Sequence, residues 1–282
     1  MMLKAGFNHL VAALLLWSAA TGLTAASAEE RANGDDSELP GKVIDPDVVA
    51  PAGPTTPYSG APAGWENFIK DSQPYAFSLI DRLEYGDADE GNTYLWDAQG
   101  WVGGDIHKFW WKTEGEGPTH GGGPENTEFQ ALYNRVISPF WGVQAGVRYD
   151  TNPNPDRGFA VLGIQGLAPY WFETDTAMFV SEDGDVSFRG EFEYELLLTQ
   201  KLILQPRLEI NASADDVPEY GLASGLNSSE AGLRLRYEIK REFAPYIGVR
   251  WEQKYGDTKD FAEAAGEDTS STAFVIGLRA WY

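Results

Sequence analysis

The sequence predicts an all-β fold: a transmembrane antiparallel outer-membrane β-barrel of about 12 strands, preceded by a disordered periplasmic tail. Three observations predict it. Segments of about ten residues alternate apolar with polar side chains. The breaks between these segments are alternately short and long, and the long breaks are acidic. Aromatic residues gather near the segment ends, where a bilayer interface would lie. A soluble β-sandwich is the alternative that alternation by itself does not exclude.

Residues 1–28 are predicted to be a secretory signal peptide. Lys4 is their only charge, an apolar run follows over 10–23, and Ala26-Ser27-Ala28 has the pattern of a cleavage site. No later stretch reaches about 18 consecutive apolar residues, the length that a membrane-spanning helix needs. Strands are therefore the elements expected to cross the membrane.

Residues 29–74 are predicted to be an acidic, Pro- and Gly-rich periplasmic tail. Their apolar density is too low to offset the entropy lost on ordering, which is typical of disorder. The segment Trp65–Ile69 is the exception, because Trp65, Phe68 and Ile69 could form one amphipathic turn that docks elsewhere. The alternative is a disordered linker that carries a stray aromatic residue.

Residues 75–282 are predicted to form the barrel. The alternation is clearest at residues 231–240, "AGLRLRYEIK", where Leu233 and Leu235 face one way and Arg234 and Arg236 the other. The same analysis places strands near 76–86, 93–102, 105–115, 127–137, 140–151, 157–167, 170–180, 185–197, 201–211, 229–240, 244–256 and 271–282.

Three positions fit this pattern poorly. Asp81 stands on the otherwise apolar face of the first strand, so the strand has either a β-bulge there or a different register. Pro206 stands inside a predicted strand, where it cannot donate a ladder hydrogen bond. The strand over 157–167 is apolar on both faces and does not reveal which side faces the lipid.

The breaks predict the topology. With a periplasmic N-terminus, the turns of about two residues lie on the periplasmic side and the long, acidic, Gly-rich loops on the outer side. An even number of strands then places both termini in the periplasm. The chain ends within its last strand, and the aromatic Tyr282 is expected where that strand meets the interface.

The charge excludes some partners and favours others. A net charge of −22 repels nucleic acid and attracts cations, so no nucleic-acid partner is predicted. Acids and bases both occupy the predicted lumen face, and we expect them to pair into a network because buried charges need partners. The sequence has no cysteine, and beyond the signal peptide only His107 and His120 are histidines. Neither has a plausible set of serine partners, so no catalytic residue is predicted.

The segment "EGPTHGGGPEN" offers candidate ligands for a metal site. His120 stands there beside Glu114, Glu116 and Glu125, and a histidine with carboxylates suits Cu(II). Glu173 and Asp175, on the lumen face of the strand predicted over 170–180, are the remaining candidate ligands. The alternative is that His120 is an exposed loop histidine, because no second imidazole is nearby.

Several long segments resemble the copper resistance protein B family. They are "LWDAQGWVGGDIHKFWWKTEGE" (95–116), "ALYNRVISPFWGVQAGVRYD" (131–150), "AVLGIQGLAPYWFE" (160–173), "LTQKLILQPRLEIN" (198–211), "GLRLRYEIKREFAPYIGVRWEQKYGDT" (232–258) and "GLRAWY" (277–282). The resemblance covers roughly residues 58–282. Members of the family often carry an N-terminal region rich in Met, His and Asp, whereas residues 29–74 offer only carboxylates.

The resemblance implies an outer-membrane barrel that acts in copper resistance, binds copper or moves it across the membrane, and works beside periplasmic copper-handling proteins. Copper would be a bound or transported ion rather than a catalytic cofactor. Two alternatives stay open: a cation-selective diffusion porin without copper preference, and a structural barrel with a plugged lumen.

Overall fold

The computed structural model describes residues 73–88, 91–153 and 155–282. The predicted signal peptide, nearly all of the predicted tail, and the segment 65–69 lie outside the described residues. The elements are β1 (Tyr75–Ala88), β2 (Gly91–Gly103), β3 (His107–Pro118), β4 (Asn126–Ser138), β5 (Trp141–Asn152), β6 (Arg157–Ala168), η1 (Pro169–Trp171), β7 (Phe172–Ser181), β8 (Val186–Glu193), β9 (Leu196–Leu197), β10 (Leu202–Ser213), η2 (Pro218–Tyr220), β11 (Gly225–Tyr237), β12 (Phe243–Lys254), α2 (Gly256–Ala265) and β13 (Ser270–Trp281).

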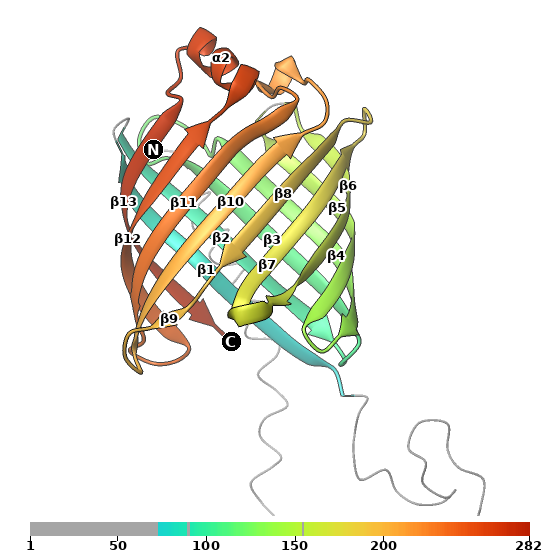
Figure 1. Ribbon diagram of the computed structural model, residues 1–282, viewed down its shortest axis with the longest axis vertical. Coiled ribbons are helices and arrows are strands. Elements are labelled where there is room, and N and C mark those ends of the chain that lie inside the picture. Colours follow the sequence, from blue (N-terminus) through green and yellow to red (C-terminus); the bar gives the residue numbers. More distant parts are fainter. Residues whose placement is uncertain (1–72, 89–90, 154) are drawn as a thin grey trace, which may run out of the picture. The chain divides into compact units, whose positions relative to one another are not determined.

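The strands form one closed antiparallel sheet (Figure 1). Strand β1 pairs with β2 on one side and with β13 on the other, which closes the ring. The short β9 continues β8 along β10 after an interruption at Tyr194 and Glu195, so the ring has twelve strands. The predicted 12-stranded barrel is thus confirmed, and closure leaves no open sheet edge in the membrane.

Pro206 explains the interruption between β8 and β9. Its carbonyl accepts a hydrogen bond of 3.1 Å from the backbone N–H of Tyr194, the first residue after β8. Proline has no N–H to return, so the ladder cannot continue regularly at this point. The register along β10 is the same on both sides of the break, so the proline interrupts the ladder without shifting the pairing.

A β-bulge in β1 resolves the position of Asp81. The register of β1 shifts between Ile80 and Arg82 against β2. Asp81 and Arg82 are therefore both buried on the lumen side, while Leu83 faces outward. One expectation is corrected here: unbroken alternation along the first strand would put Leu79 on the same apolar face as Leu83, but Leu79 lines a cavity in the lumen, because the bulge reverses the alternation before it.

The outer face of the barrel is apolar, as alternation predicts. Strand β6, which the sequence left without an orientation, exposes Leu162 and Ile164 outward. It turns Val161 inward, where Val161 packs with Leu132 and Phe179 in a small apolar cluster. A small patch of the lumen wall, on β4, β6 and β7, is thus apolar.

The two ends of the barrel differ (Figure 1). Short turns join the strands at one end, and at the other end the longer connections carry η2 and α2. The sequence predicts only a loop over residues 257–270, whereas the structure has a helix there. The Ala-rich stretch favours it, and Gly266 ends it with a φ of 79°. No helix among the described residues is long and apolar enough to cross a membrane.

Candidate functional site

The lumen holds two separate cavities. The turn-side cavity has a volume of about 300 Å³ and is lined by eight acidic and three basic residues. The loop-side cavity, of about 340 Å³, is also lined by eight acidic and three basic residues. Glu114, Glu128, Phe179 and Arg189 line both cavities and lie between them. The excess of carboxylates makes both cavities attractive to cations.

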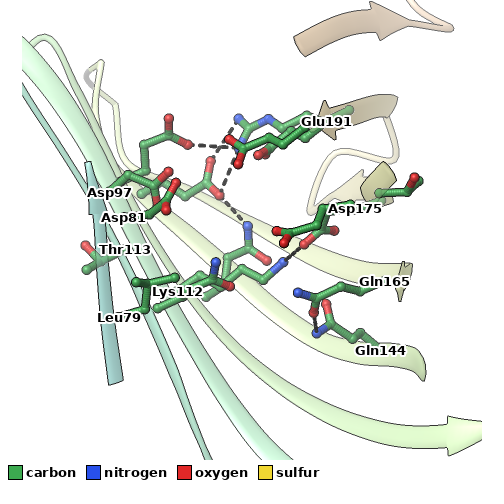
Figure 2. A pocket seen from close by; sticks show the side chains of 18 of the residues that line it. Leu79, Asp81, Asp97, Lys112, Thr113, Gln144, Gln165, Asp175 and Glu191 are labelled. Carbon is green, nitrogen blue, oxygen red and sulfur yellow. Dashed lines mark hydrogen bonds and ion pairs between the residues drawn. The ribbon is translucent and has the colours of Figure 1, made fainter. Parts of the chain in front are cut away.

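Charged and amide groups from several strands meet in the turn-side cavity (Figure 2). Lys112 on β3 forms an ion pair with Asp175 on β7, across the lumen. Gln144 donates a hydrogen bond of 2.7 Å to Gln165. Asp81, which the bulge in β1 turns inward, forms an ion pair of 2.9 Å with Arg279.

The loop-side cavity is covered in part by the long connection between β10 and β11. Arg157 forms an ion pair with Asp185, and its guanidinium lies 4.5 Å from the centre of the Tyr220 ring. Tyr220 also donates a hydrogen bond of 3.3 Å to the carbonyl of Pro155. These contacts hold the η2 segment against the barrel mouth.

That connection is further fixed by Asp216. One of its carboxylate oxygens accepts a hydrogen bond of 2.7 Å from the backbone N–H of Ser224. This bond and the neighbouring hydroxyl of Ser224 lower the pKa of Asp216 below its ordinary value. Deeper in the loops, Thr258 of α2 accepts hydrogen bonds of 2.9 Å from the N–H of Ala223 and from the amide of Asn227.

Three arginines with their carboxylates form the middle of the lumen. We call Arg82, Arg189 and Arg207 the arginine belt. Arg82 on β1 bonds to Asp97 at 3.0 Å and to Glu114 at 2.7 Å. Arg207 on β10 lies within 3.1 Å of Glu191, Glu193, Glu209 and Glu230.

The belt confirms the predicted network of paired charges. Burying a guanidinium is costly unless carboxylates and hydrogen bonds surround it, and the belt supplies both. Sequence reasoning missed Glu230 and Asp81 among the lumen residues. Extending the alternation of residues 231–240 by one position would have placed Glu230 inward, whereas the side of Asp81 depends on the bulge.

The structure spreads the six predicted copper ligands over four places. His120 and Glu125 are exposed in the loop between β3 and β4, where the Nδ1 atom of His120 lies 3.0 Å from the hydroxyl of Thr119. Glu116 accepts a hydrogen bond of 3.0 Å from Arg250. Glu114 is bound by Arg82 of the arginine belt, and Glu173 and Asp175 line the turn-side cavity. Within residues 73–88, 91–153 and 155–282, no three His, Asp or Glu side chains are grouped to hold a metal ion.

His107, the other histidine of the described residues, lies on the outer face. The Nδ1 atom of His107 is 2.5 Å from the hydroxyl oxygen of Tyr133, and the two rings are stacked 5.8 Å apart. His107 therefore lies away from both cavities.

The barrel resembles a solved porin in fold, and its sequence matches one family. The NanC porin superposes with a TM-score of 0.50 at 13% identity, over 71% of this chain and 98% of that one. Residues 75–282 match the family described as Copper resistance protein B precursor (CopB). The chain belongs to the copper resistance protein B family. The match covers all twelve strands of the ring, including the arginine belt.

Two curated relatives carry the name of the copper resistance protein B family. The chain is 44% identical to Copper resistance protein B of Escherichia coli, over 76% of this chain and 72% of that protein. It is 41% identical to Copper resistance protein B homolog of Pseudomonas syringae pv. tomato over the same shares. With the barrel fold, these similarities support an outer-membrane protein with a role in copper resistance.

Proposed function

We propose that the barrel binds copper ions or lets them cross the outer membrane. The observation that carries the proposal is the pair of acid-lined cavities within a barrel of the copper resistance protein B family. Carboxylates bind divalent cations, and a net negative lumen raises the local concentration of cations. The proposal assigns no catalytic residue, and copper is the cargo.

In this proposal the predicted ligands act in succession. His120 and Glu125 meet a copper ion at the loops, because both are exposed there. Glu116 and Glu114 follow, since they line the loop-side cavity. Glu173 and Asp175 complete the path in the turn-side cavity. We further propose that both termini and the short turns face the periplasm, where copper-handling proteins would exchange the ion.

A copper titration by calorimetry on the purified barrel tests binding. We expect heat from Cu²⁺ binding to the wild type and weaker binding to His120→Ala, because an imidazole is the softest ligand on the path. His107→Ala is the matched control, since His107 is paired with Tyr133 on the outer face. No copper binding to the wild type would leave only passage or a structural role.

Copper tolerance and cell-associated copper separate the remaining functions. Deletion of the gene is expected to change one of the two, and the wild-type gene is expected to restore it. Unchanged tolerance and copper content would contradict the proposal. A large Na⁺ conductance that is indifferent to Cu²⁺ would then indicate a diffusion porin, and a sealed lumen without metal binding would indicate a structural barrel.

A further inference from the structure

Arg189 spans the lumen where the two cavities meet. It lies on β8, and its guanidinium reaches Glu128 on β4 at 3.1 Å and Glu114 on β3 at 3.4 Å. In the order of the sheet, β8 is separated from β4 by β5, β6 and β7, so this contact joins distant parts of the wall. The Nε atom of Arg189 also donates a hydrogen bond of 3.3 Å to Asn211 on β10.

The guanidinium of Arg189 is held firmly in this position. It lies 5.7 Å from the centre of the Phe179 ring, and Phe179 is fully buried in the apolar cluster of the wall. Glu128, its main acceptor, is fixed in turn by a 2.8 Å ion pair with Arg148. Charge-assisted hydrogen bonds of this kind are shorter and stronger than neutral ones.

We propose that Arg189 closes the bore between the two cavities and sets which ions pass. Glu114, Glu128, Phe179 and Arg189 are the only residues that line both cavities among the described part of the chain. A fixed positive charge where the two cavities meet repels the cations that the acidic cavities on either side attract. A cation can pass only if it replaces Arg189 as the partner of Glu114 and Glu128. A divalent ion competes for these carboxylates better than a monovalent one.

This inference rests on the proposed function only where the passing ion is copper. Closure itself concerns any small cation. A recording in KCl without copper therefore tests it separately, and a failure of copper binding would leave that result unaffected.

Two other basic residues serve as controls. Lys112 also bridges the lumen, to Asp175, but it lines only the turn-side cavity. Arg236 is also buried, yet it bonds along its own wall, to Gln205 at 2.9 Å and to Glu195 at 2.5 Å. Each control removes one buried positive charge but leaves Arg189 in place between the two cavities.

The experiment measures single-channel conductance of the purified full chain in planar bilayers, in symmetrical KCl. We expect the wild type to conduct weakly and Arg189→Gln to conduct several-fold more, with a reversal potential in a KCl gradient that shows stronger cation selectivity. Lys112→Gln should change the conductance less, and Arg236→Gln should leave it unchanged. Heat-modifiable mobility in gel electrophoresis shows in each case that the barrel is folded.

A second variant covers the case in which Arg189→Gln does not fold. Glu128→Gln keeps the arginine and weakens its main anchor, so it should also raise the conductance, by less than the removal of the charge. Folded Arg189→Gln and Glu128→Gln barrels with wild-type conductance would overturn the proposal. An equal rise in Lys112→Gln would overturn the assignment of closure to Arg189.

Discussion

Glu84 and Arg234 form a buried ion pair in which the arginine Nε donates to the carboxylate at 2.6 Å. They lie on β1 and β11, and both side chains are 2% exposed. The hydroxyl of Tyr246 donates to the same oxygen of Glu84 at 3.0 Å. The contact links three strands near the point where the ring closes.

Breaking this pair is expected to destabilise the barrel strongly. Glu84→Ala leaves the guanidinium of Arg234 buried without its carboxylate, at a cost of ~3–5 kcal/mol in the free energy of unfolding. Denaturant unfolding in detergent measures the change. Glu263→Ala is the control, because Glu263 pairs with Lys259 on the exposed surface of α2, where such pairs contribute ~0.3–0.5 kcal/mol. Equal losses in the two variants would contradict the prediction.

A charged residue on the outer face should destabilise the barrel more, the closer it lies to the middle of the bilayer. Ile276, in the middle of β13, is 59% exposed and pairs with Ile247 of β12. Ile276→Arg should destabilise the barrel by ~2–4 kcal/mol if this residue faces the bilayer midplane. Ser270→Arg, at the loop end of the same strand, should cost ~0–1 kcal/mol. Folding into lipid vesicles under increasing urea measures both, and a variant of Ile276 as stable as that of Ser270 would rule out a lipid-facing wall.

Alternation predicts which way side chains point because it is a property of each strand alone. It placed Arg234 and Leu233 on opposite faces, and in the structure Arg234 is buried and Leu233 is exposed. It could not choose between a bulge and a shifted register at Asp81, since that choice depends on pairing with β2 and β13. It also gave no sign of α2, because a helix in a loop has a different period from the strands beside it.

Contacts across the lumen follow from the closed ring rather than from spacing. Arg189 and Glu114 are separated by 75 residues, and nothing in either segment marks the other as its partner. The candidate copper ligands show the same limit. Glu114 and Glu116 are close to His120 in sequence, yet Glu114 is held by Arg82 in the lumen while His120 is exposed in the loop. These residues are close in sequence, but they do not form one site in the structure.

Asp216 makes the order of its loop depend on pH. Its folded-state pKa is lowered from 3.8, so its contribution is fully present above that value and is lost as the pH falls. We expect the Ser224 amide to lose hydrogen-exchange protection, relative to an unfolded peptide at the same pH, in acid or in Asp216→Ala at neutral pH. Asp183→Ala, in the loop between β7 and β8, should leave the Ser224 amide protected. Protection that persists in Asp216→Ala would contradict the assigned role.

Single cysteines can test the proposed orientation, because the native chain has none to interfere. Asp183 is exposed in the connection between β7 and β8, at the same end of the barrel as α2, and Gln200 is exposed in the turn before β10, at the opposite end. If the long connections face outward, Asp183→Cys should react with a membrane-impermeant maleimide on intact cells. Gln200→Cys should react only after the outer membrane is permeabilised, since a periplasmic turn is shielded from the reagent. The reverse pattern would show that the barrel is inserted the other way, and would place both ends of the strand ring, Tyr75 and Tyr282, on the cell surface.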